Sequence, residues 1–137
     1  MKKKICLLFV LVFVFASVAQ FSVLASDIMP LNNNTNLTKT RFSISDTGEA
    51  VVSLNFEGYP NVTTSATISI KIEKRNFLLF WTDVVEETIT VNNYYYENAF
   101  YYQLEDTGTY RCTVEYVISG TGGADDVITF EDTKTYS

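Results

Sequence analysis

The chain has 137 residues, with ten Lys and Arg, sixteen Asp and Glu and no His, which gives a formal net charge of −6. The lack of an imidazole excludes Ser–His and Cys–His nucleophile systems and removes the commonest general base and metal ligand. The acidic balance argues against nucleic acid and anionic membrane surfaces as partners, because both attract basic patches.

Residues 1–25 have the composition of a secretory signal peptide. Three lysines follow the first Met, residues 5–16 are nearly all apolar, and Val23-Leu24-Ala25 supplies the −3 and −1 positions of a cleavage site. We expect cleavage before Ser26, with a second candidate after Ala19. The apolar run is short for a membrane span of about 20 residues, so we expect secretion and no stable membrane insertion after the signal is removed.

The rest of the chain has the length of one sandwich-sized domain. Removal of the signal leaves seven basic and sixteen acidic side chains, a net charge of −9. Residues 26–39 are polar, rich in Asn and Thr and aperiodic, which is typical of a flexible linker. The domain is then expected over residues 40–137. Asn33, Asn36 and Asn61 begin glycosylation sequences, which matter only in a host that modifies them.

Short alternating segments between turn residues predict six or seven strands and no helix. The segment with Trp81 is expected to hold two short strands, with a break near Glu86-Glu87. We therefore predict an all-β antiparallel sandwich of about seven strands. The expected strand regions are residues 41–45, 50–56, 66–74, 78–91, 99–104, 110–118 and 127–136.

Asp106, Gly108, Tyr110 and Cys112 form an Asp-x-Gly-x-Tyr-x-Cys pattern at the start of an alternating strand. The pattern resembles the F strand of immunoglobulin domains, in which this Tyr forms a tyrosine corner with upstream backbone. The resemblance implies an immunoglobulin-like sandwich. Residues 50–56 contain no partner Cys, so the implied fold lacks the B–F disulfide, and neither an antibody nor a receptor is implied.

Features spread over residues 40–137 also resemble small, uncharacterised secreted proteins of Gram-positive, Clostridia-like bacteria. That resemblance implies an extracellular β-sandwich and no particular activity. The features are Gly48-Glu49-Ala50, the Ile-rich segment 66–74, Trp81, Gly108-Thr109-Tyr110-Arg111 and the C-terminal residues 131–136.

The sequence singles out no catalytic or metal-binding group. Glycosidase chemistry needs only two carboxylates, but the many acidic residues show no pair marked by its spacing. Cys112 lies on the inward side of its strand and is interpreted as a small buried hydrophobe rather than a reactive or dimer-forming thiol. Asp125-Asp126 lie in a Gly-rich loop and leave calcium binding open. We expect no enzymatic activity, no cofactor and no dedicated metal site.

An aromatic run over residues 93–102 is the most unusual feature of the chain. Alternate strand residues face opposite sides, so some of these side chains must be exposed. Tyr gives a large contact area and a hydroxyl, which suits protein and sugar surfaces, although exposed Tyr also simply favours strands. The candidate binding residues are Tyr94, Tyr95, Tyr96 and Tyr101.

Together these features predict a secreted extracellular binding domain, monomeric or weakly dimeric, with no catalytic activity. Its partner is expected to be a surface protein or a glycan recognised through the exposed tyrosines. The alternative is a structural or assembly module in which a sheet edge pairs with another secreted chain.

Overall fold

Seven antiparallel strands make up residues 32–77 and 79–137, the part of the chain that the computed structural model describes. They are nine to thirteen residues long, and all except β4 exceed the segments predicted from alternation alone. The strands are β1 (Thr35–Ile44), β2 (Glu49–Gly58), β3 (Thr63–Arg75), β4 (Trp81–Val91), β5 (Tyr95–Gln103), β6 (Gly108–Gly120) and β7 (Asp126–Tyr136).

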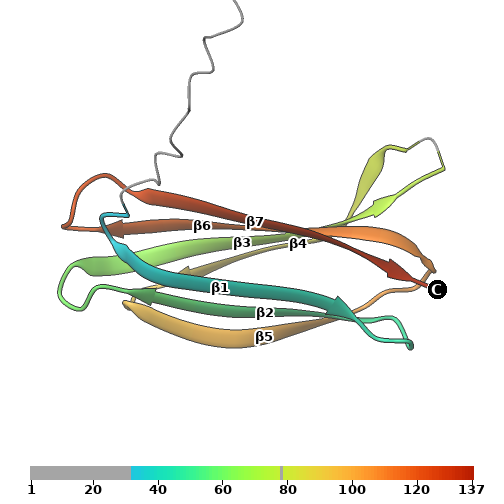
Figure 1. The fold of residues 1–137 in the computed structure, drawn as a ribbon, viewed down its shortest axis with the longest axis horizontal. Helices are drawn as coiled ribbons and strands as arrows, with labels where there is room; N and C mark the ends of the chain where they lie inside the picture. The colour runs from blue at the N-terminus through green and yellow to red at the C-terminus, as the bar shows by residue number, and fades with distance from the viewer. Residues whose placement is uncertain (1–31, 78) are drawn as a thin grey trace, which may run out of the picture. The chain divides into compact units, whose positions relative to one another are not determined.

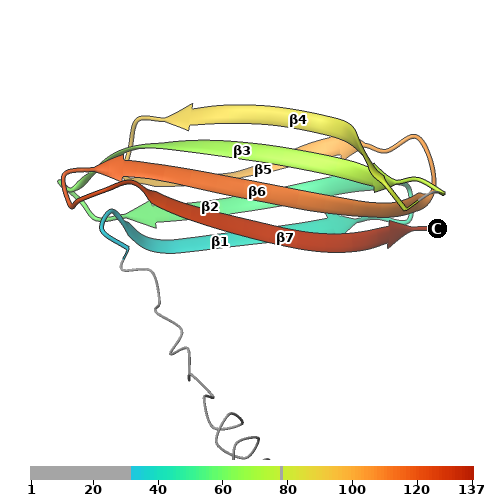
Figure 2. The same cartoon turned by 90° about the horizontal axis from the view of Figure 1, so that it is seen from above.

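The strands form two sheets, one of order β1-β2-β5 and one of order β4-β3-β6-β7 (Figure 1). The view from above spreads out the four-stranded sheet, with β4 and β7 at its edges (Figure 2). All neighbouring strands are antiparallel. The predicted all-β antiparallel sandwich of about seven strands is therefore confirmed.

The core comes from the inward-facing alternate residues of β2, β3 and β6, the central strands of the two sheets. On these strands the apolar set is almost completely buried, while the residues between them are at least partly exposed. The buried residues include Val52, Leu54, Phe56, Ile68, Ile70, Ile72, Tyr110, Cys112, Val114, Tyr116 and Ile118.

Cys112 lies among these core residues, as its inward position predicts. Its thiol is free, and burial raises the pKa of this thiol to about 12. The described residues therefore contain no inter-sheet disulfide, and the packed apolar faces hold the sheets together without one. Cys6 lies outside the described residues.

The sandwich begins earlier than the composition predicts. β1 starts at Thr35, inside the stretch expected to be a linker up to residue 39. Asp126 fixes this start, because its carboxylate accepts hydrogen bonds from the backbone amide of Asn34 at 2.8 Å and from the Thr35 hydroxyl at 2.9 Å. Thr35 to residue 39 thus belong to the sandwich. Residues 1–31, which include the predicted signal peptide, lie outside the described residues.

β4 is one continuous strand, so the predicted break near Glu86-Glu87 is wrong. Val85 and Ile89 pack against the core from this strand. Glu87 lies between them, and its carboxylate accepts a hydrogen bond from the Tyr102 hydroxyl of the other sheet at 2.5 Å. An acidic residue can therefore occupy an inward position here, because the opposite sheet supplies a donor.

Candidate binding face on the three-stranded sheet

β5 separates the aromatic run into an outer and an inner set. Tyr96, Phe100 and Tyr102 are partly buried and pack against the core. Tyr95 and Tyr101 are 44% and 64% exposed, and the alternation of a strand puts them together on the outer side of the sheet. Two of the predicted tyrosines therefore share one solvent-facing surface.

The other two candidate tyrosines lie apart from that surface. Tyr96 packs against the core, and its hydroxyl accepts a hydrogen bond from the Asn98 side-chain amide at 3.2 Å. Tyr94 precedes β5 and is exposed, and its carbonyl accepts a hydrogen bond from the Gly58 amide at 2.6 Å. Because Tyr94 lies outside the strand, alternation does not assign its side chain to the outer face of β5. Of the four predicted tyrosines, alternation along β5 thus places Tyr95 and Tyr101 on the same outer surface.

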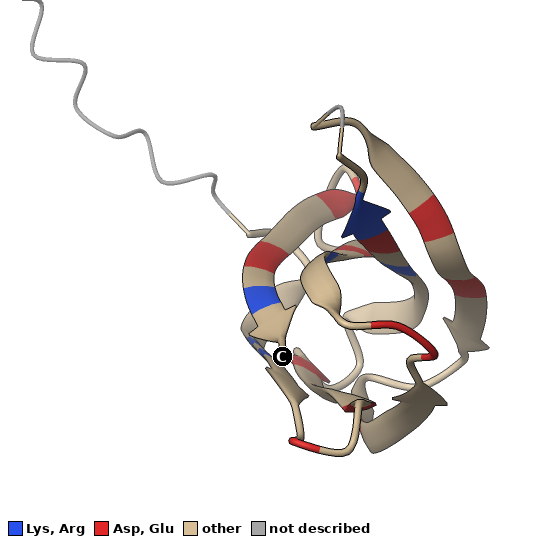
Figure 3. Ribbon diagram, turned by 90° about the vertical axis from the view of Figure 1, so that its right-hand side faces the viewer, with Lys and Arg blue, Asp and Glu red and all other residues tan. Residues whose placement is uncertain are grey.

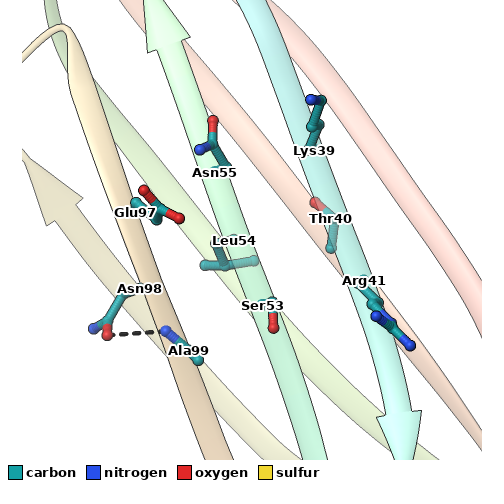
Figure 4. Close-up of a pocket in the computed structure, with 9 residues that line it drawn as sticks. All are labelled: Lys39, Thr40, Arg41, Ser53, Leu54, Asn55, Glu97, Asn98 and Ala99. Atoms are coloured by element: carbon teal, nitrogen blue, oxygen red, sulfur yellow. Dashed lines mark hydrogen bonds between the residues drawn. The ribbon is translucent and has the colours of Figure 1, made fainter.

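A shallow hollow of about 640 Å³ lies on the outer face (Figure 4). Its lining residues on β5, 97–99, fall between Tyr95 and Tyr101 along the strand. Its floor is low because Ser53 and Ala99, which stand opposite each other on β2 and β5, have small side chains. Lys39, Arg41, Ser53, Asn55, Glu97 and Ala99 point to this side from three neighbouring strands, and Thr40, Leu54 and Asn98 complete the lining.

Strand register brings the polar groups of this face into two rows. Arg41 stands opposite Ser53, which stands opposite Ala99. Lys39 stands opposite Asn55, and Asn55 stands opposite Glu97 on the other side. The rows offer hydrogen-bond donors and acceptors across the full width of the sheet.

The charges on this face are unevenly distributed. Lys39 and Arg41 form no ion pair with any residue in the described part of the chain. Glu97 accepts a hydrogen bond from the Tyr95 hydroxyl at 2.5 Å, and this bond is the main reason why the pKa of Tyr95 is raised. The β1 side of the hollow is therefore cationic, and the β5 side combines a phenol with a carboxylate.

The remaining residues singled out from the sequence lie in structural contacts away from this face. The hydroxyl of Tyr110 donates a hydrogen bond to the Asp106 carbonyl oxygen, which confirms the tyrosine corner. Gly108, between them, has a φ of 149°, which favours glycine. Trp81 stacks on the guanidinium of Arg111, whose Cζ atom lies 4.4 Å from the ring centroid.

The Asp125-Asp126 loop does not form a cation site in this structure. The carboxylate of Asp126 is occupied by the Asn33 and Asn34 amides and the Thr35 hydroxyl. Across residues 32–77 and 79–137, no group of three or more His, Cys, Asp or Glu side chains is arranged to hold a metal ion. Asp126 acts as an anchor for the start of β1.

Sequence reasoning missed most of the polar residues of the face. Lys39 falls in the stretch whose composition predicts a linker, and no motif singles out Arg41, Ser53 or Asn55. Alternation could identify each as outward-facing, but only the pairing of β1, β2 and β5 places them beside Tyr101 and Tyr95.

No protein-family model matches this chain, and the comparison with curated proteins gives no match either. Among the described residues there is no helix of the length and apolar character that a membrane span requires.

Proposed function

We propose that the chain is a secreted, non-catalytic binding domain that recognises an extracellular glycan across the outer face of its three-stranded sheet. One observation carries this proposal: two exposed tyrosines, Tyr95 and Tyr101, flank a shallow hollow lined with polar side chains. Tyr101 follows Tyr95 by six positions on β5, which corresponds to a distance of roughly 20 Å at the rise of an extended strand. A face of that length suits an extended chain better than a small molecule.

The side chains of the face match the chemistry of a sugar chain. A Tyr ring offers a flat apolar surface with a polar tip, which suits stacking on a sugar ring. Ser53, Asn55 and Glu97 offer donors and acceptors for hydroxyl groups. Lys39 and Arg41 favour a glycan with carboxylate or sulfate groups, because a guanidinium binds such anions through paired hydrogen bonds.

The same proposal includes an immunoglobulin-like sandwich and an extracellular location. The strand order supports the immunoglobulin-like assignment. So does the hydrogen bond that Tyr110, two residues before Cys112, donates to the Asp106 carbonyl. The predicted signal at residues 1–25 supports secretion.

Assembly through a sheet edge is the second candidate function. The edge strands of the four-stranded sheet carry acidic residues (Figure 3): Asp83 and Glu86 on β4, and Glu131 and Asp132 on β7. Charged side chains on edge strands oppose pairing with a further strand. This distribution disfavours assembly through the edges of the four-stranded sheet.

The test is binding of labelled residues 26–137, which contain the whole compact unit, to panels of acidic and neutral glycans, bacterial cell walls and host surface proteins. We expect saturable binding to an acidic glycan. Tyr95→Ala and Tyr101→Ala should each weaken it at least about fivefold, as truncation of a contact aromatic does. Tyr94→Ala is the matched control and should leave binding unchanged.

Arg41→Ala separates the ionic part of recognition from stacking. It should weaken binding to the acidic glycan and leave neutral analogues unaffected. Binding that survives both Tyr95→Ala and Tyr101→Ala would refute the proposed face. Concentration-dependent oligomers with no glycan binding would instead favour the assembly function.

A further inference from the structure

The turn between β3 and β4 exposes a cluster of large apolar side chains. Phe77 is 90% exposed, and Leu79 and Phe80 are each 65% exposed. The hairpin that carries them projects from the end of the four-stranded sheet (Figure 1). Exposed apolar residues scattered singly are ordinary, but adjacent ones on one projection mark an interaction site.

Three hydrogen bonds connect Asn76, Leu79 and Phe80 across this hairpin tip. The Asn76 amide donates to the Phe80 carbonyl at 2.9 Å, and the Leu79 amide donates to the Asn76 carbonyl at 3.0 Å. The Phe80 amide donates to the side-chain oxygen of Asn76 at 3.1 Å. Leu79 has a φ of 67°, an uncommon conformation for a residue other than glycine. On either side of residue 78, the described residues Phe77, Leu79 and Phe80 therefore present apolar side chains to solvent.

The charges near the tip are paired and set back from it. No charged residue lies between Arg75 and Asp83. Lys71 pairs with Asp83 at 2.9 Å, and Lys74 pairs with Asp106 at 2.9 Å. Arg75 forms no ion pair within residues 32–77 and 79–137. Burying the tip in an apolar phase would thus desolvate no charge, and one free cation would remain just behind it.

We propose that Phe77, Leu79 and Phe80 insert into the interfacial region of a zwitterionic phospholipid bilayer. Such adsorption needs exposed apolar area, which the tip provides. The hydrogen bonds among Asn76, Leu79 and Phe80 reduce the number of backbone groups that insertion would desolvate. Trp81 lies at the base of the hairpin, and Trp is enriched at the headgroup level of membranes. The long side chain of Arg75 can place its guanidinium near lipid phosphates. The tip enters only the surface layer, so the chain lies on the bilayer and does not span it.

The bilayer is favoured over a pocket in another protein by the composition of the tip. Protein interfaces surround their apolar anchors with a polar rim and directional hydrogen bonds. Here the described side chains from Phe77 to Trp81 are apolar or aromatic, and the amides of Leu79 and Phe80 are already used. The net charge of −9 left by removal of the signal opposes anionic lipids, which selects a zwitterionic surface.

Trp81 is the only Trp of the chain, so its fluorescence reports on the base of the hairpin. Residues 26–137 are titrated with phosphatidylcholine vesicles, and bound protein is measured by co-sedimentation. We expect a blue shift of the Trp81 emission and saturable partitioning. Phe77→Ser with Phe80→Ser should lower partitioning at least about tenfold, because two large apolar side chains are lost.

Val127→Ser is the control, because Val127 is an exposed apolar residue on β7, where it pairs with Val117 of β6 far from the hairpin. It should partition as the unmodified protein does, and thermal unfolding should show all variants folded. Phosphatidylglycerol added to the vesicles should weaken binding at low salt. No partitioning of the unmodified protein, or equal partitioning of the double variant, would overturn the proposal. The proposal would also be overturned if the unmodified protein formed oligomers without lipid and the double variant did not. That result would show that the tip binds a second copy of the chain.

Discussion

The hydroxyl of Tyr110 lies 2.6 Å from the carbonyl oxygen of Asp106 and donates a hydrogen bond to it. Tyr110 is buried in the core near the start of β6, so this bond fixes the connection from β5 to the sheet. We predict that Tyr110→Phe lowers the free energy of unfolding by about 1–3 kcal/mol, because the Asp106 carbonyl loses its partner. Urea denaturation measures this loss.

Tyr136→Phe is the matched control for that change. The Tyr136 side chain also packs against the core, and no hydrogen bond joins its hydroxyl to another of the described residues. Its replacement should alter the free energy of unfolding by less than about 0.5 kcal/mol. Equal effects of the two substitutions would show that the corner bond contributes nothing to stability.

Strong local patterns explain why the sandwich could be predicted from the sequence. Ile68, Ile70 and Ile72 alternate with polar residues and are all completely buried. Gly48, in the turn between β1 and β2, has a φ of 80°, a conformation that glycine adopts readily. Alternation and turn chemistry depend on residues that are neighbours in the sequence. A short segment is therefore enough to predict a strand or a turn.

The binding face and the start of β1 depend on contacts that no local pattern contains. The carboxylate of Asp126 accepts a hydrogen bond from the backbone amide of Asn34, which lies 92 residues earlier in the sequence. The hollow forms because Ser53 happens to face Ala99, and that register is set by the pairing of whole strands. Alternation determines which side of its own strand a residue faces, but not which residue stands opposite it.

Asp126 offers a second stability prediction, because three donors converge on its carboxylate. Asp126→Ala leaves the Asn33 and Asn34 amides and the Thr35 hydroxyl without their acceptor. We expect a loss of about 1–3 kcal/mol in the free energy of unfolding, measured by urea denaturation at pH 7. Asp125→Ala changes the exposed neighbouring acid and should have almost no effect. A comparable loss in both variants would contradict the anchoring role.

The contribution of Asp126 should also depend on pH in a defined direction. Burial raises the pKa of this carboxyl, but the hydrogen bonds from Asn33, Asn34 and Thr35 outweigh burial and lower the pKa below its ordinary value. A lowered folded-state pKa stabilises the protein above the unfolded-state value, and this stabilisation is lost as pH falls through the folded-state value. The stability difference between the unmodified protein and Asp126→Ala should therefore shrink below about pH 4.

Cys112 should be chemically silent while the domain is folded. Burial raises the pKa of its thiol to about 12, and the thiolate is the reactive form. We predict no reaction of residues 26–137 with a thiol reagent such as dithionitrobenzoate at pH 8, and full reaction of one thiol in denaturant. Rapid labelling of the native protein would show that the strand opens or that the core packing around β6 is wrong.

Arg111 connects Glu73 to Trp81 on the outer side of the four-stranded sheet. Its Nε and Nη2 atoms donate to the same Glu73 oxygen at 2.9 and 2.7 Å, and its guanidinium stacks on the Trp81 ring. Glu73 is buried, and the next cation, Lys71, lies 3.7 Å away. Arg111→Ala should therefore cost about 1–3 kcal/mol, because it leaves a mostly buried carboxylate with a single, more distant partner.

A second substitution shows whether the unpaired charge causes that cost. Adding Glu73→Gln to Arg111→Ala removes the charge and should restore part of the lost stability, which a double-mutant cycle in urea measures. Lys134→Ala breaks the more exposed pair with Asp132 and serves as the control, with an expected change below about 1 kcal/mol. Equal losses in the free energy of unfolding from Arg111→Ala and Lys134→Ala would show that water solvates Glu73 in the variant. They would also show that its pair with Arg111 stabilises the sheet no more than a surface ion pair does.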